Sequence, residues 1–111
     1  MVINKPSIFI YTNQPDERCL KEICAGIEEE GVFYEVFDKE ASDLDTLAFD
    51  AANESMMGSG IGLIGKSVAL QMLGITKGNN IEICIDADYS DCRRIGADSA
   101  RIIKKLPLKL I

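Results

Sequence analysis

The chain contains no histidine. This absence excludes Ser-His-Asp triads, Cys-His dyads and histidine metal ligands, and it removes the commonest general base of enzyme active sites. No apolar run approaches the roughly 18 residues that a membrane-spanning helix requires. No apolar segment follows a basic start, as it would in a secretory signal. We therefore expect a protein that does not enter a membrane and does not use histidine in catalysis.

Cysteine occurs four times, but no two cysteines form a C-x-x-C pair. Cys19 and Cys24 are spaced so that they would not share one face of a helix well. A disulfide framework of the kind found in secreted proteins is therefore not expected. We predict that Cys19, Cys24, Cys84 and Cys92 are small buried side chains, reduced in the cytosol.

Basic residues are in deficit, and the net charge of −6 argues against a general nucleic-acid-binding protein. The charge is uneven, because residues 1–92 carry a net charge of −11 and residues 93–111 carry +5. The basic segment either contacts an acidic partner or complements the end of a helix. The second interpretation is favoured, and the first stays open.

The 111 residues are 47% hydrophobic and 27% charged, which is typical of one globular domain, residues 1–111, rather than of a disordered chain. The apolar pattern predicts a strand at 7–12, a helix at 15–30 that ends at Gly31, and a second strand at 32–37. A strand, a helix and a strand in succession predict two parallel neighbours in one sheet.

The middle of the chain adds a helix and a hairpin. Ser42 is expected to cap the helix, with Asp45 at the capping-box position, and residues 54–60 read as a loop. Two apolar runs follow, at 61–64 and 68–73. The short gap between them begins with glycine and therefore favours a hairpin over a crossover.

A last strand is predicted at 81–85, followed by a helix that opens at Ser90 or Asp91 and ends at Pro107. The sum is an α/β fold. We predict a three-layer α/β/α domain with a five-stranded mixed sheet, in which the fourth strand is antiparallel to the others.

Residues Gly60–Ser67 match the phosphate-loop pattern G-x-x-x-x-G-K-S/T, and Asp86 follows a later strand as in many nucleotide hydrolases. A phosphate loop requires a strand before its first glycine and a helix after its Lys-Ser pair. Residues 53–59 make a poor strand, and residues 61–64 read as a strand themselves. The pattern is therefore interpreted as a hairpin, with nucleotide binding as the alternative.

Three consecutive carboxylates, Glu28, Glu29 and Glu30, stand at the predicted end of the first helix. They repel one another and oppose the helix dipole, which costs roughly 0.3–1 kcal/mol for each exposed charge. A divalent cation or a basic surface could compensate for this cost. Taken alone, the triplet is better explained as a tolerated, solvated cluster.

Two motifs resemble a known family. Gly26-Ile-Glu-Glu-Glu-Gly31, directly after an apolar strand and helix, resembles the small (beta) subunit of the reactivating factor for coenzyme B12-dependent diol and glycerol dehydratases. The pattern Arg93-x-x-Gly96-x-x-Ser99-Ala100-Arg101-x-x-Lys104-x-x-Pro107 is similar to that family's C-terminal signature, in which the Ser99 position is usually alanine. The resemblance covers nearly the whole chain. It implies a three-layer fold of the anticodon-binding-domain type with one antiparallel strand.

The resemblance implies an interaction subunit rather than an enzyme. In that family the small subunit pairs with a large, actin-like ATPase subunit, two copies of each. The complex acts like a chaperone on B12-dependent dehydratase that holds damaged cobalamin. The small subunit resembles the dehydratase's own medium subunit, and subunit swapping lets the damaged cofactor leave while the large subunit hydrolyses ATP. No cofactor of its own, no nucleic acid and no membrane are implied as ligands.

The resemblance also implies site residues. The family's small subunit supplies one glutamate to a divalent cation, Mg2+ or Ca2+, that the large subunit mainly holds, and Glu28 matches that position. Glu29 and Glu30 are the alternatives if the register differs. Together with Arg93 and Arg101 they are interface candidates, although the arginines could instead order the local structure.

Two other functions are kept as alternatives. The first is the medium subunit of a B12-dependent dehydratase, which would contact cobalamin but is usually longer. The second is a small phosphate-loop nucleotide-binding protein. The expected location is the cytoplasm, with a bacterial microcompartment left open, and a homodimer of the isolated subunit also stays open.

Overall fold

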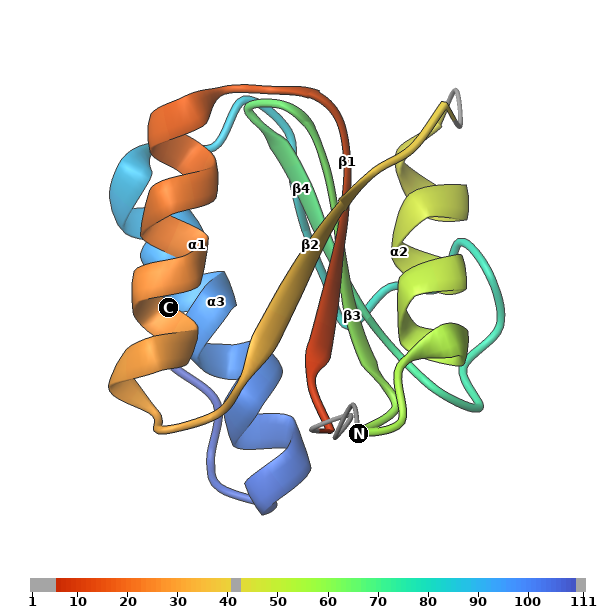
Figure 1. Ribbon diagram of the computed structural model, residues 1–111, viewed down its shortest axis with the longest axis vertical. Helices are drawn as coiled ribbons and strands as arrows, with labels where there is room; N and C mark the ends of the chain where they lie inside the picture. The colour runs from red at the N-terminus through yellow and green to blue at the C-terminus, as the bar shows by residue number, and fades with distance from the viewer. Residues whose placement is uncertain (1–5, 41–42, 110–111) are drawn as a thin grey trace, which may run out of the picture.

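The computed structural model describes residues 6–40 and 43–109, which form five strands and three helices (Figure 1). In chain order these elements are β1 (Ile8–Pro15), α1 (Glu17–Glu29), β2 (Tyr34–Asp38), α2 (Leu44–Glu54), β3 (Ser59–Gly65), β4 (Ser67–Met72), β5 (Glu82–Cys84) and α3 (Tyr89–Lys104).

The five strands form one sheet in the order β2-β1-β3-β4-β5. β1 is parallel to both β2 and β3, whereas β4 is antiparallel to β3 and to β5. The fourth strand is thus the antiparallel one, and the predicted fold class is confirmed. The parallel pairing of β1 with β2 follows from the helix that connects them, because α1 carries the chain back to the same end of the sheet.

Helices cover both faces of the sheet. α1 and α3 lie side by side on one face, and α2 covers the other (Figure 1). The larger core lies between the sheet and the α1–α3 layer, and a smaller aromatic cluster lies under α2. The bulky side chains of the larger core that are fully shielded from solvent are Ile8, Ile10, Ile23, Ile27, Ile61, Leu63, Val68, Leu70 and Ile95.

Two glycines allow α1 and α3 to touch through their backbones. A Cβ atom on Gly26 would lie 2.2 Å from the carbonyl oxygen of Arg93, and one on Gly96 would lie 2.1 Å from the carbonyl oxygen of Ile23. Both distances are far shorter than any real Cβ contact. The glycines therefore bring the acidic end of α1 within reach of the side chains of α3.

The helix starts differ from the sequence predictions because aspartates cap all three helices. α1 begins at Glu17, not at residue 15, since Pro15 still pairs with Gly65 in the sheet and Asp16 is the N-cap. Asp88 caps α3, where Ser90 or Asp91 was expected, and Asp91 completes the capping box.

Two further boundaries were predicted less exactly. The predicted cap Ser42 lies outside the described residues, and the side chain of Asp43 accepts the hydrogen bond from the Thr46 backbone at the start of α2. The predicted loop 54–60 ends earlier than expected, because Ser59 and Gly60 already belong to β3.

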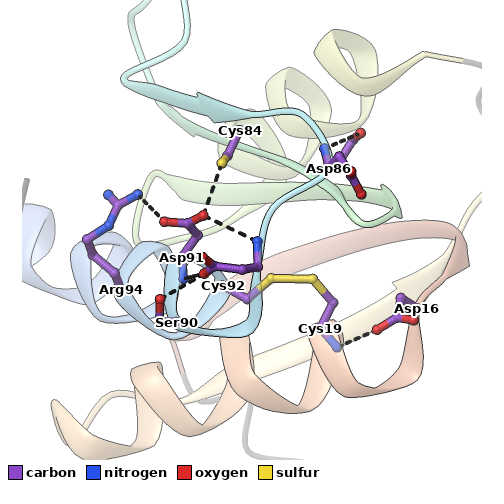
Figure 2. Close-up of a disulfide and its surroundings, with 10 residues drawn as sticks. Asp16, Cys19, Cys84, Asp86, Ser90, Asp91, Cys92 and Arg94 are labelled. Atoms are coloured by element: carbon purple, nitrogen blue, oxygen red, sulfur yellow. Dashed lines mark hydrogen bonds and ion pairs between the residues drawn. A yellow bond between two sulfur atoms is a disulfide. The ribbon is translucent and has the colours of Figure 1, made fainter. Parts of the chain in front are cut away.

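The prediction that all four cysteines are reduced is wrong for two of them. Cys19 of α1 and Cys92 of α3 are fully buried, as expected, but they form a disulfide with a Cα–Cα distance of 5.7 Å (Figure 2). Their spacing in the chain gave no sign of this bond, because it depends on the close approach of two helices. Cys24 and Cys84 are free and half-buried.

The described part of the chain contains no helix that is long and apolar enough to cross a membrane.

Candidate interaction site

The acidic triplet closes α1 at the edge of the molecule. Glu28 and Glu29 lie in the last turn of α1, and Glu30 is its C-cap residue. No basic residue of α1 itself stands in that last turn, so the helix supplies nothing to balance its own unfavourable charge. The compensating groups must come from another element.

Helix α3 supplies cations for two of the three carboxylates. The Arg93 Nε atom donates to Glu29 Oε1 at 2.6 Å, and this hydrogen bond holds the pKa of Glu29 below its usual value. The Arg101 Nη1 atom donates to Glu30 Oε2 at 3.2 Å. Lys104 donates to the backbone carbonyl of Glu30, which is one of the unpaired carbonyls of the helix end. Part of the basic segment therefore complements a helix end within the chain.

Glu28 is bound differently. Its Oε1 atom accepts a hydrogen bond of 2.7 Å from the hydroxyl of Tyr34, and this bond raises the pKa of Tyr34. Within the described part of the chain, no lysine or arginine lies within ion-pair distance of Glu28. The side chain is exposed. Glu28 is thus the member of the triplet with which no lysine or arginine of the described residues forms an ion pair.

Arg93 and Arg101 act within the chain in this structure. Arg93 bridges two carboxylates of α1, with Nη1 2.9 Å from Glu22 Oε1 in addition to its contact with Glu29, and both bonds raise its pKa. Arg101 also donates from Nε to the carbonyl oxygen of Pro107 at 2.6 Å, which ties the segment after α3 to the helix. Both arginines thus have contacts within the chain, and their contact with a partner stays a prediction.

The described residues contain no group of three or more Cys, Asp or Glu side chains placed to hold a metal ion. Glu28 nevertheless offers a carboxylate oxygen, the ligand that Mg2+ and Ca2+ prefer.

The phosphate-loop pattern is a β-hairpin, as predicted. β3 and β4 run antiparallel from Ile64↔Ser67 to Ser59↔Met72, and no helix follows Ser67. β3 lies between β1 and β4, so its backbone N–H groups serve the sheet rather than a phosphate. The nucleotide-binding alternative lacks the geometry that it requires.

The hairpin makes a simple prediction for Lys66. Its Nζ atom lies 5.3 Å from the centre of the Tyr89 ring, so Lys66→Ala removes one exposed cation–π contact worth roughly 0.5–1 kcal/mol. We expect calorimetric titration with ATP and Mg2+ to give the same result for the variant and the wild-type chain. Binding by the wild-type chain that Lys66→Ala abolishes would contradict the assignment as a hairpin.

Sequence reasoning missed several residues that matter here. Tyr34 was read only as a strand residue, although its hydroxyl holds Glu28. A charged cluster of Glu82, Arg94 and Asp98 between β5 and α3 was not anticipated either. The position of Asp98 on the apolar face of α3, next to Ile95 and Ile102, was the one signal for it.

Comparison with known proteins places the chain in a family. Residues 5–109 match the sequence model of the dehydratase medium subunit family. Since this match spans almost all of the 111 residues, the chain belongs to that family. No curated protein sequence matches it.

Two solved structures share the fold over nearly their whole length. A diol dehydratase-reactivating factor complexed with ADP and Mg2+ has a TM-score of 0.87 and 22% sequence identity, covering 96% of this chain and 100% of the other. A glycerol dehydratase reactivase has a TM-score of 0.88 and 23% identity, covering 96% and 98%. The fold implied by the sequence resemblance is therefore confirmed.

Proposed function

We propose that the protein is the small subunit of a chaperone-like reactivating factor for B12-dependent diol or glycerol dehydratase. Three findings support this proposal: the family match, the likeness to chains of two reactivating factors over their full length, and the two sequence motifs. The observation that carries it is the state of the acidic triplet. Glu29 and Glu30 are paired within the chain, whereas Glu28 is exposed and forms no ion pair with a residue in the described part of the chain.

In this proposal the subunit docks on a large ATPase subunit, two copies of each forming the complex. Glu28 contributes one carboxylate oxygen to a Mg2+ or Ca2+ ion that the large subunit mainly holds. The cation would neutralise the remaining charge of the triplet across the interface. ATP is hydrolysed in the large subunit, and the small subunit has no catalytic role or cofactor of its own.

The client of the complex is dehydratase that holds damaged cobalamin, which leaves when subunits are swapped. Because the chain belongs to the dehydratase medium subunit family, it has the fold needed to take that subunit's place. The proposed location is the cytoplasm or a microcompartment within it. Whether the isolated subunit forms a homodimer is a separate question that sedimentation would answer.

Glu29, Glu30, Arg93 and Arg101 are proposed to serve the interface indirectly. Their ion pairs fix the end of α1 against α3. A fixed helix end holds the Glu28 carboxylate and its Tyr34 partner in one place, which reduces the side-chain entropy lost on binding.

Glu28→Gln is expected to abolish the dependence of subunit association on the divalent cation. The amide is a weaker ligand for a hard cation than a carboxylate, so the affinity for the large subunit in Mg2+ should fall about tenfold or more. The measurement is the dissociation constant of the two purified subunits, in Mg2+ and in a chelator. The variant in Mg2+ should bind like the wild type in the chelator.

Two variants serve as controls. Glu35→Gln removes the same charge from an exposed site on β2, and Glu30→Gln removes a carboxylate that Arg101 already pairs with. Both should keep the cation dependence. An equal loss in all three variants would contradict the role of Glu28. Failure of the wild-type chain to bind a genuine large subunit in Mg2+ would contradict the proposed function itself.

The family match also supports a second candidate, the medium subunit of a dehydratase. That function predicts contact with cobalamin. Titration of cobalamin into the chain combined with the other dehydratase subunits, followed by its visible absorption, separates the two functions. Cobalamin bound by that assembly would favour the medium subunit.

A further inference from the structure

Two carboxyl groups meet in a buried place between β5 and α3, away from the acidic triplet. The Glu82 side chain of the edge strand is 8% exposed, and Asp98 of α3 is 0% exposed. Arg94 lies beside both: it donates from Nη1 to Glu82 Oε1, and the same nitrogen is 3.9 Å from Asp98 Oδ2.

Each of the two carboxyl groups has one oxygen without a hydrogen-bond donor. Glu82 Oε2 and Asp98 Oδ2 are buried, and no donor of the described residues reaches them. The other Asp98 oxygen accepts from the backbone N–H of Lys109 at 2.7 Å. Because the same Arg94 nitrogen lies against Glu82 and 3.9 Å from Asp98 Oδ2, the two carboxyl groups are close neighbours. Two ionised carboxylates placed in this way would repel each other, whereas one proton between them would supply the missing donor.

The charges around the pair relieve this repulsion only in part. Arg94 is shared with a third carboxylate, Asp91, at 3.4 Å from its Nη2 atom, and Asp91 also faces the Cys84 thiol (Figure 2). β4 presents the apolar Leu70 opposite Glu82. Arg94 also lines a neighbouring groove, whose other charged groups are Arg18, Glu22 and Glu29 of α1, Arg93 of α3 and Lys109 after α3. One guanidinium thus serves three carboxylates.

We propose that Glu82 and Asp98 share one proton in mildly acidic solution, and that this shared proton fixes the edge strand β5 to α3. β5 has three residues and pairs with β4 alone in the described sheet, so its backbone hydrogen bonds hold it weakly. The contacts of the Glu82 side chain with α3 hold β5 in addition to its pairing with β4. When the proton dissociates, the Glu82 and Asp98 carboxylates repel each other, and the contact between β5 and α3 weakens.

Burial and the neighbouring Asp98 raise the pKa of Glu82 to about 7, compared with an ordinary glutamate value of about 4.3. Because the folded protein holds the proton more tightly than the unfolded chain, this site adds most to stability below the unfolded pKa. Its contribution is lost as the pH rises from about 4.3 to about 7, and it is constant above that. The contact between β5 and α3 is therefore expected to become more stable as the pH falls.

Glu82→Gln tests the proposal because its amide can donate to Asp98 permanently. In the wild-type protein we expect the melting temperature to fall by roughly 5 °C or more between pH 5 and pH 8, and the protection of the β5 amides from hydrogen exchange, corrected for intrinsic rates, to fall with it. In the variant both changes should be largely absent. The control, Glu35→Gln on the exposed face of β2, should behave like the wild type.

A carboxyl titration reads the proton directly. The Glu82 carboxyl carbon, followed by NMR, should titrate near pH 7 in the wild type and shift toward an ordinary value in Asp98→Ala. A wild-type Glu82 that titrates between pH 4 and 5 would overturn the shared proton. Equal protection of β5 at pH 6 and pH 8 in the wild type would overturn its role in fixing the strand.

Discussion

Gly96→Ala is expected to destabilise the protein by about 3 kcal/mol or more. Alanine is favoured over glycine in a helix by about 1 kcal/mol, so a substitution in α3 would stabilise the protein if nothing faced it. The new Cβ, however, would lie 2.1 Å from the backbone oxygen of Ile23 and 2.9 Å from its Cα atom. Backbone atoms cannot rotate aside, so α1 and α3 must separate. Overpacking of this kind costs 1–3 kcal/mol, and more where no side chain can yield.

Urea unfolding measures this loss, and Gly31→Ala provides the control. Gly31 has a φ angle of +73°, but no atom lies within 4 Å of the place that a Cβ would occupy there, so alanine pays only the conformational cost of about 1–2 kcal/mol. A Gly96→Ala variant as stable as the wild type would show that the helices do not touch through their backbones. The pairing of Arg93 and Arg101 with the acidic triplet would then lose its structural basis.

The fold could be predicted because its signals are local. Residues 61–64 and 68–73 are apolar runs separated by a glycine-led gap, and Gly65 adopts a φ of +55° at that turn. The βαβ unit followed from a strand, an amphipathic helix and a second strand in close succession. Those patterns depend on neighbours within a few residues, which a sequence displays directly. They also favoured the hairpin over the phosphate loop, whose strand and helix would have to occupy the same residues, and the strand pairing of the structure then decided between them.

The capping residues were predicted less well because several polar residues compete at each helix start. Ser90, Asp91 and Asp88 can all accept a backbone hydrogen bond, and in the structure Asp88 is the residue that accepts it, from the backbone N–H of Asp91. At α1 the sheet extends through Pro15, since β1 remains paired with β3 to that point. Tertiary pairing thus moved a boundary that local preferences had set two residues earlier.

The site depended on contacts that the sequence does not display. Arg93 and Glu29 are 64 residues apart, and Arg101 and Glu30 are 71 apart. The family resemblance singled out Glu28, but without it the sequence pattern did not distinguish the three glutamates from one another. What distinguishes them is the backbone contact of α1 with α3, which brings cations to Glu29 and Glu30. The same contact joins Cys19 to Cys92.

Reduction of the Cys19–Cys92 disulfide is expected to lower the free energy of unfolding by about 4 kcal/mol. The bond links residues 73 positions apart, and a cross-link that closes so long a loop removes much of the entropy of the unfolded chain. Because a domain of this size is commonly stable by only 5–15 kcal/mol, the loss is a large share of the total. Urea unfolding of the oxidised and the reduced protein measures it, with m-values compared, because the cross-link also compacts the unfolded state.

Cys24→Ser and Cys92→Ser separate the bond from the chemistry of a free thiol. Cys24 is free, so Cys24→Ser should keep the full difference between oxidised and reduced protein, whereas Cys92→Ser should show none. Thiol counting in denaturant should find two reactive groups in the oxidised wild type and four after reduction. Four groups without reductant would show that the bond does not form in solution. In that case the backbone contact at Gly26 and Gly96, together with the ion pairs of the acidic triplet, would hold α1 to α3 without a covalent link.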